Sequence, residues 1–273
     1  EMRRLPTENG QRISVVVADF QCKGRGQGTN TWESERGKNL LFSIKIRPVM
    51  VPVRCQFLLS MAGGLAIKDA LDAYTAGITL KWPNDVYWND RKICGTLIEI
   101  TLSAGRIKDC IFGIGLNVNQ QVFTSDAPNP VSLAQILDHE TDRKKLLNEV
   151  LEAFDKYYSW IENGRYGDIS ALYHEALYHR HGFYPYRDVA KNEVFEAAIV
   201  EVEDDGTLVL RDRKGVFISK KTQEEIAEIV YVAAAGKLTI GAFVEHILRH
   251  HLEIHRDEID ILFEQQFRKR FER

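Results

Sequence analysis

The chain has 273 residues, with 36 Lys and Arg against 39 Asp and Glu, and a formal net charge of −3. This length predicts one or two domains, and the 44% hydrophobic content excludes wholesale disorder. The near-balance of charge argues against a protein that binds polyanions over its whole surface. No apolar run approaches the roughly eighteen residues of a membrane span, and the first residues lack a signal-peptide core. We therefore expect a cytoplasmic protein that does not enter a membrane.

The four cysteines are spread far apart and form no CxxC pair: Cys22, Cys55, Cys94 and Cys110. Zinc-ligand spacing is absent, and a chain of this length rarely depends on a disulfide framework. The pattern predicts reduced thiols.

Hydrophobic periodicity in the first half predicts strands around one helix. Apolar residues at 13–18 and 40–47 predict strands. The polar, glycine-rich stretch 19–39 between them predicts a long loop, and loops of this length are usually functional or disordered. Apolar positions at helical spacing predict a helix over 53–74, where Gly63-Gly64 indicates either a weak helix or close packing on a sheet. Further strands are predicted at 78–82, 86–88, 92–102 and 106–119.

The second half predicts helices followed by a small β segment. One apolar face predicts a helix over 142–162, and a second helix is predicted over 168–179. Alternating residues at 195–212 predict a hairpin within a small β domain that starts at about Gly182.

These elements predict the α+β class, with a mixed or antiparallel sheet and flanking helices, because no βαβ alternation continues along the chain. We expect three parts, at 1–181, 182–214 and 215–273.

Two polar segments are suited to holding an anion or a nucleophile. In residues 24–28, GRGQG, the glycines allow close backbone approach and Arg25 offers a bidentate fork, although a flexible loop without a ligand would look the same. In residues 81–85, KWPND, a Lys, an Asn and an Asp meet at a turn fixed by proline. That cluster is suited to orienting a nucleophile or a nucleotide, or it is a solvated turn.

Two strand segments also carry unusual residues. Lys92 enters a strand that reads as buried, where it is costly unless it meets an anion or extends to the surface. Gly113 and Gly115 stand within one strand, which indicates a bulge, a ligand against the backbone, or packing on a neighbouring element.

In this order and spacing, three blocks resemble the biotin protein ligase family, most closely its Bacteroidetes members: ADFQCKGRGQGTNTWESERGKNLLFSI, KWPNDVYWNDRKICGTLIE and GIGLNVN. The resemblance implies a catalytic domain of the biotin/lipoate ligase type over 1–181 and a partial SH3-like β domain over 182–214. It further implies a reaction in two steps. Biotin and ATP form biotinyl-5′-AMP, with magnesium as cofactor, and the biotinyl group then passes to a lysine of a biotin carboxyl carrier domain.

The resemblance also implies roles for particular residues. Arg25 and Lys92 would place cations at the developing charge, and Asp85 would accept a hydrogen bond from the incoming lysine amine. Biotin contacts are implied for Gln21, Gly24, Arg25, Lys92, Gly95, Gly113 and Gly115. Nucleotide contacts are implied for Gln27, Trp32, Asn84 and Asn117, with Trp32 stacked on the adenine.

The chain departs from the family pattern at two places. Position 27 holds Gln where the family usually has Arg, which weakens the expected retention of the adenylate. The family's Ser-Thr-Asn motif belongs upstream of Gln21, near or before position 1. Since Met2 also follows Glu1, we expect a fragment or trimmed product that lacks part of its biotin pocket.

The tail, 215–273, does not resemble the end of a biotin ligase. A predicted short strand, VFISKK, and helices at about 222–234 and 239–268 resemble a ribbon-helix-helix unit of mobile-element accessory proteins. Such a unit would make a homodimer and present Ser219, Lys220 and Lys221 to DNA. The ten basic and ten acidic residues from Lys214 to Arg273 weaken the DNA interpretation and favour a helical extension that packs on its own chain or dimerises. Four histidines near i, i+4 spacing lack a Cys or carboxylate partner, so no protein metal site is predicted: His246, His250, His251 and His255.

The leading hypothesis is therefore an enzyme, an ATP-dependent biotin protein ligase. The alternative is a truncated, inactive ligase core fused to a ribbon-helix-helix dimerisation or DNA-binding module. Lipoate ligases share the general fold, but the GRGQ and KWPND blocks favour biotin.

Overall fold

The computed structural model describes residues 12–22, 24–26, 31–125, 127–212, 220–234, 244, 247, 250–251 and 253–256. The chain divides into two compact units, Glu1–Lys214 and Gly215–Arg273, which are described separately.

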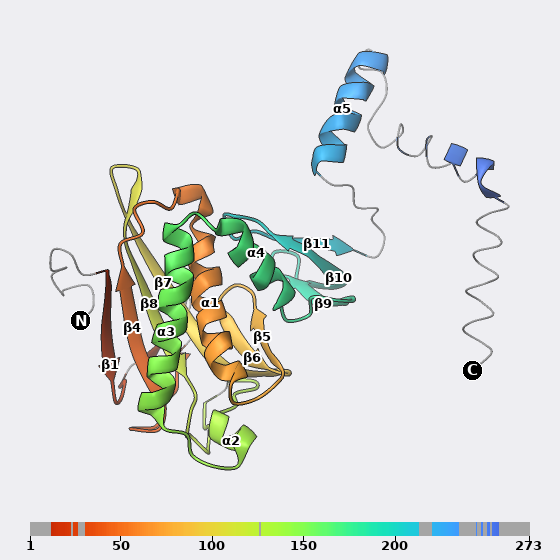
Figure 1. Cartoon of the computed structure of the whole chain (residues 1–273). Helices are drawn as coiled ribbons and strands as arrows, with labels where there is room; N and C mark the ends of the chain where they lie inside the picture. Colours follow the sequence, from red (N-terminus) through yellow and green to blue (C-terminus); the bar gives the residue numbers. More distant parts are fainter. Residues whose placement is uncertain are drawn as a thin grey trace, which may run out of the picture. The chain divides into compact units, whose positions relative to one another are not determined.

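The first unit is built on a six-stranded sheet with the order β1-β4-β8-β7-β6-β5 (Figure 1). All neighbouring strands in it run antiparallel, so the predicted α+β fold with an antiparallel sheet is confirmed. The strand bounds are β1 Ile13–Ala18, β4 Leu40–Ile46, β5 Ile78–Lys81, β6 Asp85–Trp88, β7 Arg91–Ser103 and β8 Arg106–Leu116. A separate pair of two-residue strands, β2 (Gly24–Arg25) and β3 (Thr31–Trp32), lies in the segment predicted as a long loop.

The two faces of the sheet differ in what covers them. Side chains alternate between the faces along each strand, and those on one face, such as Phe42, Phe112 and Ile114, are buried. Helices α1 (Phe57–Asp72) and α3 (Arg143–Glu162) cover that face (Figure 1). The intervening residues point to the opposite face, which the two helices leave uncovered.

Helix α1 packs unusually close to the sheet. An added Cβ on Gly63 would lie 2.9 Å from Cε1 of Phe112, whereas one on Gly64 would lie 3.4 Å from Leu80, an ordinary contact. Of the two interpretations of Gly63-Gly64, close packing is therefore the one observed. The helix begins at Phe57 and not at the predicted residue 53, because a 3₁₀ turn, η2 (Val53–Cys55), follows Pro52 and precedes α1.

The predicted helix over 142–162 is confirmed as α3. Its N-cap Asp142 accepts hydrogen bonds from the backbone N–H groups of Lys144 and Lys145, and its buried side chains repeat along one face. The helix predicted over 168–179 is α4 (Tyr166–Glu175), which ends earlier because the next residues join the sheet edge. Leu80 donates its N–H to the carbonyl of Ala176 and accepts the N–H of Tyr178. The sequence interpretation missed α2 (Leu133–Leu137), which a capping box at Ser132 starts.

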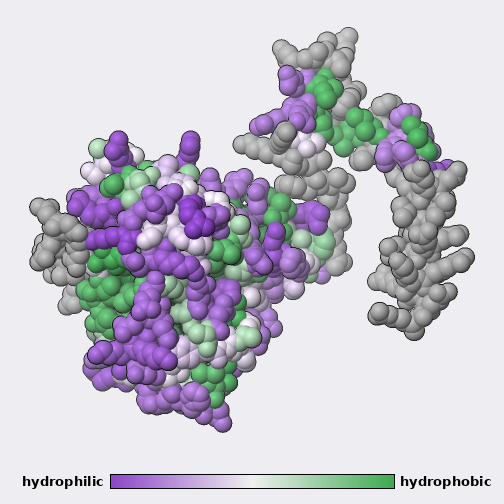
Figure 2. Space-filling model, viewed as in Figure 1, coloured by the Kyte–Doolittle hydropathy of each residue, from purple (hydrophilic) through white to green (hydrophobic). Residues whose placement is uncertain are grey.

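A second, three-stranded sheet completes the first unit, with the order β11-β10-β9. The predicted hairpin over 195–212 is β10 (Glu193–Val202) and β11 (Leu208–Asp212). Strand β9 (Tyr184–Asp188) pairs with the edge of β10 opposite to β11. The face of this unit seen in Figure 2 is mainly hydrophilic, as expected where the apolar side chains lie inside.

In the second unit, α5 spans Lys220–Ala234, in agreement with the helix predicted at about 222–234. The predicted strand VFISKK is wrong at its last two residues, because Lys220 and Lys221 begin α5 in a run rich in good helix formers. Residues 216–219, which include Ser219, lie outside the described residues. Most described positions between 244 and 256 are helical. Within the described ranges, no helix is both long and apolar enough to cross a membrane.

The two adjacent glycines of α1 give a matched test of this packing. Gly64→Ala should stabilise the protein by about 0.5–1 kcal/mol through helix propensity, because its Cβ has room. Gly63→Ala gains the same propensity but presses on the buried Phe112 ring, and should destabilise by about 1–2 kcal/mol net. Urea unfolding of the two variants measures both effects. Equal free energies of unfolding for the two variants would contradict the close packing at Gly63.

Candidate active site

A patch of sheet without side chains lies on the uncovered face. Gly95 of β7 and Gly115 of β8 are directly paired, and Gly113 lies two residues along β8. The indole of Trp32 rests on this patch. A Cβ added to Gly115 would lie 2.4 Å from the ring atom Cε2 of Trp32, and a Cβ added to Gly95 would lie 3.0 Å from its Cζ3. At Gly113 the nearest atom would be 3.6 Å away. Glycine is thus needed at 95 and 115 for a flat ring to reach the backbone.

Lys92 and Asp85 form an ion pair beside this patch. Lys92 Nζ lies 2.7 Å from Asp85 Oδ2, and their side chains are 32% and 24% exposed. Lys92 Nζ is also 5.8 Å from the centroid of the Trp32 ring. Lys92 therefore meets an anion, as one of the two sequence interpretations required, and the ammonium, the carboxylate and the indole share one face.

A β-bulge puts Lys92 on that face. Between β6 and β7 the register changes from Val86↔Cys94 to Tyr87↔Lys92, so Ile93 is an extra residue. Ile93 and Cys94 are both fully buried. Because the bulge interrupts the alternation, Lys92 points to the same face as Asp85 and Gly95 instead of into the core.

The turn between β5 and β6 is held by hydrogen bonds to β7 and α1. The side-chain amide of Asn84 donates to the carbonyl of Thr96, and the Thr96 N–H donates back to the Asn84 carbonyl at 3.1 Å. Ser60 Oγ of α1 donates to the carbonyl of Pro83 at 3.2 Å. Asn84 thus fixes the turn against β7, and its contact with a nucleotide stays a prediction.

Asn117 lies at the end of β8 and is almost fully buried. Its side-chain amide donates to the carbonyl of Val131 at 3.1 Å. Its Oδ1 is buried and has no hydrogen-bond partner in the described part of the chain. The role of Asn117 toward a nucleotide also stays a prediction.

The glycine-rich loop reaches the site through the β2–β3 pair. Gly24 pairs with Trp32 and Arg25 with Thr31. An added Cβ on Gly24 would lie 2.3 Å from the Trp32 carbonyl oxygen and 3.2 Å from Gln21 Oε1, so Gln21 and Gly24 lie next to Trp32. The side chain of Arg25 and all of Gln27 lie outside the described residues.

A tether that the sequence interpretation missed holds the segment after Trp32. The carboxylate of Glu33 accepts the backbone N–H of Thr124 at 2.9 Å and that of Ser125 at 2.8 Å, and the Thr124 hydroxyl at 3.0 Å. Burial raises the pKa of Glu33, but the hydrogen bonds from Ser125 and Thr124 outweigh it and lower the pKa from 4.5 to about 2. The partners lie more than ninety residues away in the sequence, and no local signal marks them.

Residues 3–119 match the family model described as "Biotin/lipoate A/B protein ligase family". Over these residues the chain is similar to that family. The Bacillus spizizenii bifunctional ligase/repressor BirA is 30% identical over 234 residues, which cover 78% of this chain and 66% of that protein. The Mycobacterium tuberculosis biotin–[acetyl-CoA-carboxylase] ligase is 31% identical over 145 residues, which cover 52% of each chain. The chain thus spans just under two thirds of the length of the Bacillus relative and about half that of the Mycobacterium one.

A solved structure shares the fold over most of the chain. The biotin protein ligase of Aquifex aeolicus in complex with biotin and ATP superposes with a TM-score of 0.65 at 24% identity, over 79% of this chain and 88% of that chain. Residues 207–266 match a different model, described as a protein of unknown function, DUF3408. The resemblance of the tail to a ribbon-helix-helix unit stays a prediction.

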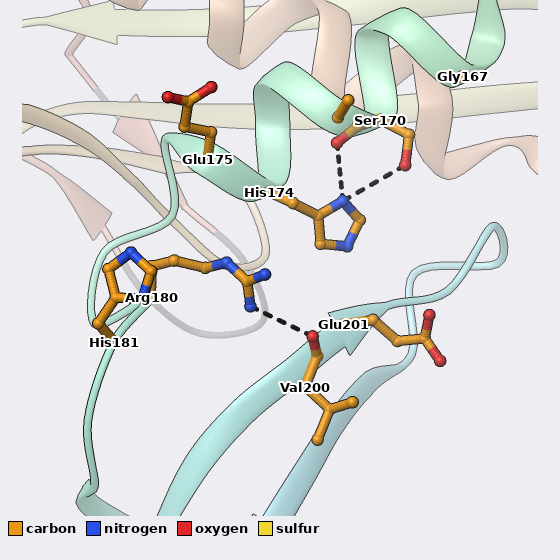
Figure 3. A pocket seen from close by; sticks show the side chains of 9 residues that line it. Gly167, Ser170, His174, Glu175, Arg180, His181, Val200 and Glu201 are labelled. Atoms are coloured by element: carbon orange, nitrogen blue, oxygen red, sulfur yellow. Dashed lines mark hydrogen bonds between the residues drawn. The ribbon is translucent and has the colours of Figure 1, made fainter. Parts of the chain in front are cut away.

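The glycine patch with its ion pair is distinct from the hollow of about 770 Å³ between α4 and β10 (Figure 3). Two of the polar groups that line the hollow are engaged in holding the small sheet. His174 Nε2 accepts the Val202 N–H at 2.8 Å, so the proton of the imidazole is on Nδ1, which donates to the carbonyl of Ser170. Arg180 donates to the Val200 carbonyl at 3.2 Å. None of Lys92, Asp85 and Trp32 lines it. We therefore place the site on the glycine patch.

The Glu33 tether gives a pH-dependent prediction. Because the pKa of Glu33 is lower in the folded protein, its contribution is fully present above about pH 4.5 and is lost as the pH falls toward about 2. Glu33→Gln should lower the free energy of unfolding at pH 7 by about 1 kcal/mol, a small value because the loop is partly open to solvent. The difference from the unmutated chain should shrink between about pH 4.5 and 2.

Urea unfolding at several pH values measures this difference, with Glu35→Gln, at an exposed position two residues away, as the matched control. A loss that stays constant down to the lowest pH at which the chain folds would contradict the tether.

Proposed function

We propose that this chain is an ATP-dependent biotin protein ligase. In the first step the biotin carboxylate attacks the α-phosphorus of ATP, which forms biotinyl-5′-AMP and releases pyrophosphate. In the second step a lysine amine of a biotin carboxyl carrier domain attacks the acyl carbon, which forms an amide and releases AMP and a proton. The observation that carries the proposal is the ammonium of Lys92, 2.7 Å from Asp85, beside a glycine patch that accepts a flat ring.

The glycine patch supports a bicyclic or aromatic ligand group. Gly95 and Gly115 bring the backbone into contact with a ring, as the seated Trp32 indole demonstrates. The Nε1 of that indole is buried and has no hydrogen-bond partner among the described residues. A ligand ring on Gly95 and Gly115 would take the place of this indole, and the displaced Nε1 could then reach a hydrogen-bond partner.

The ion pair supports the charge requirements of the first step. Two anions must approach each other, and a cation at the point of closest approach stabilises the charge that develops there. Lys92 Nζ is fixed by Asp85 at the edge of the glycine patch, where a ligand carboxylate and an α-phosphate would meet. Arg25, in the paired β2, would add a second cation from the loop.

Asp85 supports the second step. An amine that reaches the acyl carbon must be oriented with its lone pair forward and must lose a proton, and a neighbouring carboxylate serves both needs. Asp85 stands at the first position of β6, on the same face as Lys92. Its two oxygens allow it to hold Lys92 and the amine at the same time.

Magnesium would enter with the nucleotide. No group of three His, Cys, Asp or Glu side chains in the described part of the chain is placed to hold a metal ion. Mg²⁺ is commonly bound through phosphates and one or two carboxylates. The ion would therefore be held chiefly by the phosphates of the nucleotide.

Biotin-dependent release of pyrophosphate from ATP tests the proposal. The same measurement distinguishes an active ligase from the alternative, an inactive core fused to a dimerisation module. Release of pyrophosphate and labelling of a carrier domain with biotin are expected. A chain that binds neither biotin nor ATP, with no release, would overturn the proposal.

Lys92→Ala should reduce adenylate formation by a factor of 10² to 10³, on the order of 3–4 kcal/mol of barrier, because it removes the cation from the developing charge. Lys92→Arg keeps the charge and should retain more activity. Lys108→Ala, at an exposed position in β8, is the control for loss of a lysine. Pyrophosphate release is measured in each variant. Undiminished release from Lys92→Ala would remove Lys92 from the site.

Asp85→Asn should slow transfer far more than adenylation. The amide still accepts a hydrogen bond from Lys92, so the first step should fall only a few-fold, whereas loss of the proton acceptor should slow transfer by about 10²-fold or more. Biotinyl-5′-AMP should accumulate when a carrier domain is present. Single-turnover measurement of each step checks this. An equal loss in both steps would place Asp85 in the nucleotide site.

A further inference from the structure

Trp82 ties the turn that carries Asp85 to a distant part of the chain. Trp82 is the first residue after β5, three positions before Asp85. Its indole Nε1 donates to the carbonyl oxygen of Gly206 at 2.9 Å, across 124 residues of sequence. Gly206 lies in the turn between β10 and β11 of the small sheet.

The turn that presents this carbonyl is itself fixed. The Gly206 N–H donates to the Glu203 carbonyl at 2.9 Å, and the Phe57 N–H at the start of α1 donates to the Asp204 carbonyl at 3.3 Å. Gly206 has a φ of +97°, a conformation that favours glycine, and an added Cβ would lie 2.7 Å from Cδ2 of Phe57. The acceptor for Trp82 is therefore a defined point and not a flexible loop.

The turn at residues 82–84 is thereby held from three elements. Ser60 of α1 bonds to Pro83, Thr96 of β7 bonds to Asn84, and the small sheet bonds to Trp82. Two of these contacts come from the main sheet and its covering helix, and the third comes from the small sheet alone. Asp85 follows directly, and a carboxylate displaced by about 1 Å can slow a reaction 10²-fold.

We propose that Trp82 is a positioning residue, whose bond to Gly206 makes the small sheet part of the machinery that sets Asp85 for acyl transfer. The proposal rests on the proposed function. It assigns the small sheet a role in the second step, through a hydrogen bond that the main sheet cannot supply.

The chain offers a matched control in the same hairpin. At the far end of β6, Trp88 Nε1 donates to the carbonyl of Ala76 at 3.1 Å. Trp88→Phe therefore removes the same kind of indole-to-carbonyl bond, away from Asp85. Trp82→Phe should lower the rate of transfer about tenfold, while adenylation and the KM for the carrier domain change less than twofold. Trp88→Phe should leave both steps within twofold, with a similar change in Tm.

A second pair of measurements tests the coupling. Gly206→Ala should move the acceptor carbonyl and reproduce the selective loss of transfer, and adding Trp82→Phe to it should lower transfer no further, since both changes break one contact. Hydrogen exchange of the Thr96 amide, which bonds to Asn84, should accelerate in Trp82→Phe and not in Trp88→Phe.

The outcomes separate the two proposals. If the unmutated chain releases no pyrophosphate, the proposed function fails, and the exchange measurement still tests whether Trp82 orders the turn. If the unmutated chain is active but Trp82→Phe slows both steps equally, or behaves as Trp88→Phe does, the positioning role is wrong and the proposed function stands. Additive losses in the double variant would likewise overturn it.

Discussion

The extra residue at Ile93 is the constraint on which the site depends. A regular β7 would direct Lys92 into the core beneath α1 and α3, where an unpaired ammonium is prohibitively costly. The bulge instead buries Ile93 and Cys94 together and directs Lys92 to the open face, within 2.7 Å of Asp85. One irregularity in the register thus places a lysine ammonium on the open face of a strand whose next two residues lie in the core.

The two faces of the sheet differ in structure: one is packed under helices, and the other leaves the backbone accessible. Apolar side chains on the covered side hold the sheet rigid under α1 and α3. On the other side, Gly95 and Gly115 remove the side chains that would keep a flat group away from the backbone. Trp32 reaches this patch from the loop, and the Glu33 carboxylate fastens the segment that follows it to Thr124 and Ser125. The sheet and the tethered loop therefore meet next to the ion pair.

The small sheet extends this arrangement beyond the segment that the family model matches, residues 3–119. Its turn at Gly206 contacts both the start of α1 and the indole of Trp82. At the end of α4 and just after it, the side chains of His174 and Arg180 bond to the backbone of β10. The sheet is thus attached at two separate places.

The sequence by itself determined the fold class, most strand and helix positions, and the residues Lys92, Asp85, Gly95, Gly115 and Trp32 that meet in the site. Periodicity and short motifs suffice for the elements and for Lys92, Asp85 and Gly115, because they express which face of each element is apolar and which residues are chemically unusual. Gly95 and Trp32 came from the family resemblance. Tertiary structure alone decided that α4 ends before Ala176, that Lys92 shares a face with Asp85, and that Glu33 and Gly206 matter. Each of these depends on a partner far away in the sequence: Leu80 for the end of α4, β6 for the bulge, Thr124 and Ser125 for Glu33, and Trp82 for Gly206. Local patterns carry no record of such pairs, since a hydrogen bond between distant segments exists only once the chain has brought them together.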